Sequence, residues 1–161
     1  MSLLLIYNNK EEYLIIPSEA IRVRVIANSN KKEDIEIKEQ LKDKLNIELR
    51  KILLNITNIS EAREKINDNL DFINKFVDKS LNELNYDNNY SINYGLNYFP
   101  EKVFKGLVYS EGLYESLVIT LGEGKGPNYW CVLYPPLCLI DNSKEETEYR
   151  FFIKELIDKY L

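Results

Sequence analysis

The stretch GLYESLVITLGEGKGPNYWCVLYPPLCLID, residues 112–141, contains the only tryptophan of the chain, both of its cysteines and three of its five prolines. Residues 116–121 alternate between Leu or Ile and Ser, Val or Thr, and this period of two predicts a half-buried strand. The next residues include Gly122, Gly124 and Gly126, which provide the positive-φ freedom that a hairpin turn requires.

A return strand is predicted over residues 129–134, which are mainly aromatic or apolar. Pro135 and Pro136 must end it, because proline has no backbone N–H to donate to a neighbouring strand. Residues 137–140 are apolar again and are expected to lie against the core. We interpret the two strands and the glycine turn as a β-hairpin at the centre of the protein.

The two cysteines, Cys131 and Cys138, flank the Pro-Pro pair. In a straight strand they would face opposite ways at this spacing, so only a bend at the prolines brings them within disulfide distance. Two interpretations therefore remain open: two buried free thiols, or a disulfide if the protein is exported.

A strand before this stretch is predicted over residues 21–27, with small apolar residues on one face and Arg22 and Arg24 on the other. Exposure of both arginines on an open sheet face, where they aid solubility, is the favoured interpretation. The alternative is a basic row that meets an acidic partner.

Helical spacing of apolar residues occurs in three segments: residues 37–53, residues 60–84 and a last segment from Ser143 to the end. Residues 90–99 alternate as a strand and are followed by a proline. These elements predict an α+β fold: a mostly antiparallel sheet of about four strands with two long helices packed on one face, plus a C-terminal helix.

The length of 161 residues fits one domain. We expect a lead-in segment over residues 1–19, a single α+β domain over residues 20–141 and an amphipathic helix over residues 142–161. The apolar run at residues 3–7 is too short for a complete signal-peptide core. It fits either an ordinary terminal strand or the remnant of a trimmed export segment.

Composition narrows the possible functions. The net charge of −5 argues against nucleic-acid binding. The absence of histidine excludes Ser-His and Cys-His nucleophiles and most zinc sites, so no catalytic residue, cofactor or metal is expected.

Residues 122–126, GEGKG, look like a phosphate loop, but a strand rather than a helix follows them, which favours a turn. Abundant Asn, Ile, Lys and Tyr are typical of a low-GC bacterium.

Three segments together resemble the stage II sporulation protein R family of low-GC Gram-positive bacteria. They are Arg24-Val-Ile-Ala-Asn-Ser29, Glu61-Ala-Arg63 and the run Gly112-x-Tyr-Glu…Gly122-Glu-Gly-Lys-Gly-x-Asn-x-Trp-Cys-Val-Leu-x-Pro-Pro-Leu-Cys138. The resemblance covers about residues 17–141. Family members commonly carry two tryptophans before the first cysteine, and here Tyr129 stands in place of one.

The resemblance implies a role that composition does not reveal. It implies a protein that is secreted from the forespore into the space between the forespore and mother-cell membranes. There it would activate a membrane-embedded aspartic protease, by contact with its extracytoplasmic part, and the protease would process the sigma-E precursor. The protein would be a signal and not an enzyme.

Two other functions are weighed against this one. An exported enzyme acting on the cell wall would need carboxylates such as Glu115 and Glu123, and a deep polar cleft around Glu115 would favour it. A structural module of the spore envelope is the other alternative.

A partner-binding surface is expected where aromatic anchors gather on a rigid turn, because such residues bury large areas at little entropic cost. The residues expected to form it are Arg22, Arg24, Gly122, Gly124, Lys125, Gly126, Tyr129, Trp130, Pro135 and Pro136.

The disulfide interpretation predicts that both cysteines resist alkylation in the unreduced protein, as measured by mass spectrometry. Because the closed loop is short, reduction is expected to lower the free energy of unfolding by about 2–3 kcal/mol. Two alkylated cysteines in protein made under oxidising conditions would contradict the disulfide.

Overall fold

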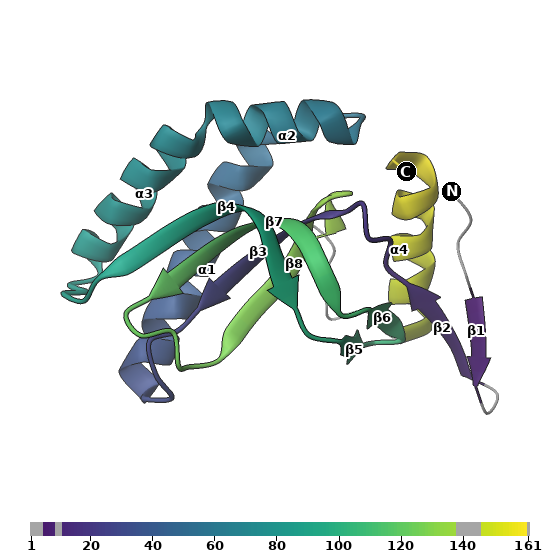
Figure 1. Cartoon of the computed structure of the whole chain (residues 1–161), viewed down its shortest axis with the longest axis horizontal. Helices are drawn as coiled ribbons and strands as arrows, with labels where there is room; N and C mark the ends of the chain where they lie inside the picture. Colours follow the sequence, from purple (N-terminus) through teal and green to yellow (C-terminus); the bar gives the residue numbers. More distant parts are fainter. Residues whose placement is uncertain (1–4, 9–10, 138–145, 161) are drawn as a thin grey trace.

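The computed structural model describes residues 5–8, 11–137 and 146–160. Within them lie two four-stranded sheets and four helices (Figure 1). In chain order the elements are β1 (Leu5–Asn8), β2 (Glu11–Ile15), β3 (Ile21–Ile26), α1 (Lys32–Ile52), α2 (Ile59–Asp68), α3 (Leu70–Glu83), β4 (Tyr90–Phe99), β5 (Lys102–Phe104), β6 (Leu107–Tyr109), β7 (Gly112–Leu121), β8 (Asn128–Tyr134) and α4 (Glu146–Tyr160).

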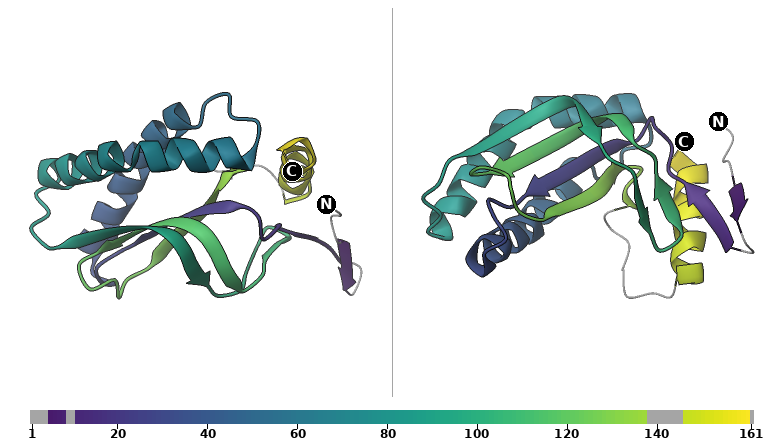
Figure 2. Two further views of the ribbon diagram at one scale, coloured as in Figure 1. Left: turned by 45° about the horizontal axis from the view of Figure 1, so that its top comes forward. Right: turned by 60° about the horizontal axis from the view of Figure 1, so that its bottom comes forward.

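The main sheet has the strand order β4-β7-β3-β8, and α1, α2 and α3 cover one of its faces (Figure 2). The α+β class is therefore confirmed. The sheet is mixed, because β3 runs parallel to β7 and antiparallel to β8. The core between sheet and helices contains Val23, Val25, Leu117 and Ile119 from the strands and Leu41, Leu45, Ile73 and Val77 from the helices.

The predicted hairpin is wrong in its pairing, although both of its strands exist. β7 and β8 do not pair with each other, because β3 lies between them. The loop that joins β7 to β8 passes over the end of β3, where the Lys125 and Gly126 amides donate to the Asn28 and Ala27 carbonyls at 3.1 and 2.9 Å. The glycines thus permit a close backbone crossing instead of a tight two-strand turn.

The second predicted helix is divided in two. Asn69 has non-helical dihedral angles, φ −105° and ψ 8°, and lies between α2 and α3. Its side chain donates to the Lys65 carbonyl at 2.7 Å, a local bond that competes with helix continuation. The apolar stripe crosses this break because both helices pack on the same core, which includes Ile66 and Ile73.

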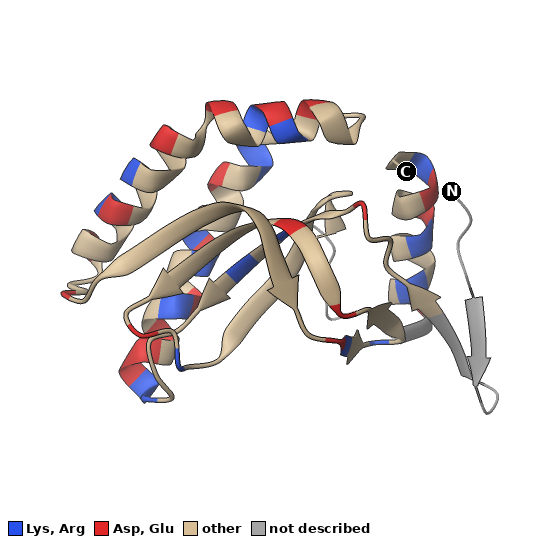
Figure 3. Cartoon of the chain, viewed as in Figure 1, with Lys and Arg blue, Asp and Glu red and all other residues tan. Residues whose placement is uncertain are grey.

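Acidic and basic residues are interspersed along the helices (Figure 3). This arrangement is that of solvated helix faces, as the mixture of charges in the sequence predicts. None of the described helices is long and apolar enough to cross a membrane.

A second, smaller sheet has the strand order β1-β2-β6-β5. The segment expected to be only a lead-in thus contains two strands, with β2 parallel to β6. Leu14, Leu107 and Val132 form a second core with Ile153 of α4. The terminal helix therefore packs on the protein's own core.

Replacing Gly126 by alanine is expected to lower the free energy of unfolding by about 2 kcal/mol, the usual cost of overpacking. The added Cβ would overlap the backbone carbonyl of Ser29, which cannot move without breaking the crossing over β3. Gly95→Ala is the matched control, because the nearest atom to its Cβ would be 3.9 Å away. Urea unfolding of both variants measures the difference, and equal stabilities would contradict this account of the loop.

Candidate functional site

The side chain of Arg22 is the most unusual feature of the main sheet. Val23 and Val25 of β3 point into the core below the helices, so Arg22 and Arg24 lie on the opposite face, as the alternation predicts. The expected exposure of Arg22 is wrong, because its side chain is 0% exposed. Aromatic residues from four other strands enclose it, and such long-range packing leaves no trace in the local pattern.

Four rings surround the guanidinium of Arg22. Its Cζ lies 4.1 Å from the ring centroid of Phe99, 4.6 Å from Tyr114, 5.1 Å from Tyr109 and 5.6 Å from Trp130. These distances are within the range of cation–π attraction, which partly replaces the lost hydration of the charge. We call Arg22, Arg24, Lys102 and these four rings the cation–aromatic cluster.

Trp130 is the ring that all three cations share. The Arg24 Cζ lies 5.5 Å and the Lys102 Nζ 5.0 Å from its centroid. The Arg24 Nε also donates to Asn128 Oδ1 at 3.3 Å. Among the described residues none of these three cations forms an ion pair, so the cluster concentrates positive charge in a protein whose net charge is negative.

Burial leaves the charge of Arg22 poorly compensated. Its Nε, Nη1 and Nη2 atoms are buried without a hydrogen-bond partner, and so is Nε1 of Trp130. Burial lowers the pKa of Arg22, and the charge of Arg24 acts in the same direction, while Tyr114 and Tyr109 partly offset it. The pKa of Lys102 is likewise lowered, by the partial burial of its amino group and by the charge of Arg22, although the residue as a whole is exposed.

A cavity of about 220 Å³ adjoins the cluster, where the main sheet meets the small sheet and α4. Arg22 and Lys102 supply its charge and Asn128 its amide, while most of the remaining wall is aromatic or apolar. The residues that line it are Arg22, Lys102, Phe104, Tyr109, Asn128, Tyr129, Trp130, Cys131, Leu137 and Tyr149.

The residues expected to bind a partner fall into three groups. Arg22, Arg24 and Trp130 meet in the cation–aromatic cluster. Residues 122–126 form the loop over the end of β3. Pro136 lines a second, more apolar cavity of about 330 Å³ beside the end of α1.

Two other expected contact residues point elsewhere. The Tyr129 hydroxyl accepts a hydrogen bond from Asn46 of α1 at 3.1 Å, so this ring is anchored on the helical side. Pro135 is buried. Neither side chain is therefore a freely exposed anchor.

Sequence reasoning missed Phe99, Lys102, Tyr109 and Tyr114 as members of the cluster. Only Tyr114 carried a signal, because it belongs to the Gly112-x-Tyr-Glu segment of the family resemblance. The other three are an aromatic residue at a strand end and two residues of short strands, and nothing local connects them with Arg22.

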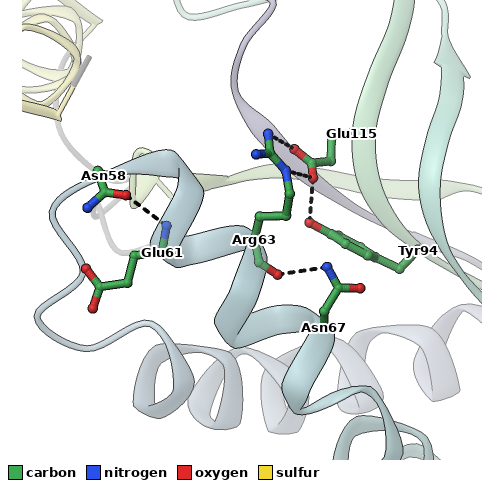
Figure 4. Close-up of polar contacts among 6 residues, drawn as sticks. All are labelled: Asn58, Glu61, Arg63, Asn67, Tyr94 and Glu115. Atoms are coloured by element: carbon green, nitrogen blue, oxygen red, sulfur yellow. Dashed lines mark hydrogen bonds and ion pairs between the residues drawn. The ribbon is translucent and has the colours of Figure 1, made fainter.

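The carboxylate of Glu115 is fully engaged (Figure 4). Arg63 of α2 donates to it twice, from Nε at 2.7 Å and from a second guanidinium nitrogen at 3.0 Å, and the Tyr94 hydroxyl donates at 2.9 Å. The hydrogen bond to Glu115 raises the pKa of Arg63, and burial together with the same carboxylate raises the pKa of Tyr94. This triad ties α2 to β4 and β7, which is a structural role.

Glu123 lies in a different setting from Glu115. It is exposed in the loop over β3 and forms an ion pair with Lys125 at 3.0 Å. Neither carboxylate lines either of the two cavities described above. In the described ranges, no three His, Cys, Asp or Glu side chains gather as a metal site would require.

Of the predicted disulfide pair, the structure describes one member. Cys131 is half-buried and disulfide-bonded. Cys138 lies outside the described residues, so its pairing with Cys131 stays a prediction.

Comparison with known proteins gives one family. Residues 17–144 match the family described as stage II sporulation protein R. A protein of Bacillus subtilis (strain 168) named stage II sporulation protein R is 36% identical over 151 residues, which cover 94% of this chain and 65% of that relative. The chain thus spans less than two thirds of the relative's length. No solved structure matches it significantly.

Substituting methionine for Arg22 is expected to raise the free energy of unfolding by about 1 kcal/mol, because the desolvation of an unpaired charge outweighs its cation–π attraction. Methionine keeps the length of the side chain and packs well against rings. Arg63→Met is the control, and it should lower the free energy by about 1 kcal/mol through loss of the two-pronged bond to Glu115. Chemical denaturation compares the two variants; a larger loss for Arg22→Met would make Arg22 a structural residue.

Proposed function

Because the chain belongs to the stage II sporulation protein R family, we propose that it is a secreted signalling protein. It activates the membrane-embedded aspartic protease that processes the sigma-E precursor in the mother cell. It acts in the space between the forespore and mother-cell membranes, by binding the extracytoplasmic part of the protease. The observation that carries the proposal is the family match over residues 17–144.

The cation–aromatic cluster supports a binding role. Tryptophan, tyrosine and arginine are the residues that most often dominate the energy of protein interfaces. Trp130 and Arg24 are half-buried, so part of each is accessible to a partner, and both are held in place by neighbouring strands. A rigid, partly exposed aromatic anchor loses little entropy when a partner covers it.

The cell-wall enzyme is the less favoured alternative. Both oxygens of Glu115 already accept hydrogen bonds from Arg63, and one of them accepts a third from Tyr94. A carboxylate held in this way is poorly placed to exchange a proton with a substrate. Glu123 is exposed to solvent and paired with Lys125, outside both cavities.

The proposal predicts that Trp130→Ala weakens binding to the extracytoplasmic part of the protease by about 2 kcal/mol or more, which is roughly thirtyfold in Kd. Processing of the sigma-E precursor should fall accordingly. A pull-down measures the first effect. Immunoblotting of cells that contain the protease, the precursor and an exported form of this protein measures the second.

Lys79→Ala is the control for this experiment, because Lys79 is an exposed cation of α3 that lines neither cavity. The double variant Glu115→Gln, Glu123→Gln tests the enzyme alternative and should retain processing. Lost processing in a double variant with an unchanged melting temperature would favour the enzyme and contradict a purely signalling role.

A further inference from the structure

The cavity beside Trp130 has donors and positive charge, but its described lining residues include no carboxylate to match them. Arg22 lines it and is 0% exposed, with all three guanidinium nitrogens lacking a hydrogen-bond partner. Lys102 lines the same cavity, and no Asp or Glu is among its described lining residues. Buried donors are normally satisfied, so this arrangement indicates a site built for an anionic acceptor.

The rings around Arg22 hold its guanidinium in a fixed position. Aromatic rings contact its guanidinium through cation–π attraction, with the Phe99 centroid only 4.1 Å from Cζ. The planar guanidinium carries its N–H groups as a rigid fork of donors, and all three of its nitrogens are buried without a hydrogen-bond partner. The guanidinium is held in position before any ligand arrives. Binding therefore costs little conformational entropy of the Arg22 side chain.

The lining indicates the chemical class of the acceptor. A carboxylate matches the guanidinium fork with two parallel hydrogen bonds, and Lys102 adds a second charge. Phe104, Leu137 and Tyr149 form apolar wall, which suits a carboxylate carried on an apolar group. A polyanion such as a nucleic acid is disfavoured by the net charge of −5.

We propose that this cavity binds one carboxylate of a protein partner, with Arg22 as the buried anchor, Lys102 as a second cation and the Trp130 indole N–H as a further donor. The carboxylate is either an acidic side chain or a free chain terminus. The proposal rests on the proposed function for the identity of the partner as a protein. The binding of a carboxylate is testable without that partner.

The isolated chain provides its own reporter, because Trp130 is the only tryptophan and gives a single indole N–H signal in a ¹⁵N-correlated NMR spectrum. N-acetylphenylalanine represents a terminal carboxylate and N-acetylglutamic acid α-amide a side-chain carboxylate. Their uncharged counterparts are N-acetylphenylalaninamide and N-acetylglutamine amide. A saturable shift of the indole signal is expected with at least one carboxylate, at least tenfold stronger than with its amide.

The two carboxylates distinguish the source of the partner's carboxylate. Tighter binding of N-acetylphenylalanine indicates a chain terminus, and tighter binding of N-acetylglutamic acid α-amide indicates an acidic side chain. Equal affinity for acids and amides, or no saturable shift with any of the four, would overturn the proposal. Inorganic phosphate is the remaining probe. Phosphate binding as tight as that of the better carboxylate would overturn the assignment to a carboxylate.

Variants locate the site. Arg22→Met should abolish the shift and Lys102→Met should weaken binding at least threefold, whereas Arg50→Met should bind like the wild type. Lys102 is exposed, so its variant keeps the test decisive even if Arg22→Met fails to fold. Unchanged affinity in folded Arg22→Met or in Lys102→Met would overturn the assigned site.

The cell assay separates this inference from the proposed function. Carboxylate binding by a protein that neither binds the protease nor promotes precursor processing would support the site and contradict the proposed function. Processing that is unaffected by a folded Arg22→Met would keep the proposed function and overturn a role of this cavity in partner binding.

Discussion

The pairing of β3 with strands on both of its edges is the constraint on which the rest of the structure depends. β7 lies parallel on one edge and β8 antiparallel on the other. This central position makes both faces of β3 interior surfaces: Val23 and Val25 pack under the helices, and Arg22 is enclosed by rings from β4, β6, β7 and β8. An edge strand would have left Arg22 accessible to water on one side, and its charge would then require no special environment.

Arg22 and Arg63 show two different environments for the same charged group. Arg63 is about half exposed and meets Glu115 at the surface, where its charge is balanced by a carboxylate of the same chain. Arg22 is more deeply buried and is surrounded by rings, with two further cations nearby. A protein gains little stability from the second arrangement. An acceptor from outside the chain, as proposed above, would satisfy the donors that this arrangement leaves unpaired.

Sequence patterns predicted the positions of the strands and helices better than the pairing of the strands in the sheet. The strands at residues 21–27, 90–99, 116–121 and 129–134 and the helical segments were all found, because periodicity reports which side chains share a face. Periodicity does not report which strand lies alongside. The hairpin prediction failed for this reason: two strands joined by glycines are usually partners, but here the glycines serve the crossing over β3. The burial of Arg22 was missed for the same reason, since it depends on four strands that are distant in sequence.

The loop over β3 also has a consequence for folding. Because β7 and β8 each pair with β3 and not with each other, the centre of the sheet joins residues from opposite ends of the chain, such as Val23 with Leu117 and Arg24 with Trp130. Contacts of this kind have a high contact order and close slowly, since a long intervening segment must be ordered first. Until the last strand has docked, one edge of β3 presents open backbone groups to any other extended chain. The cation–aromatic cluster is therefore complete only when β4, β6, β7 and β8 have all joined β3.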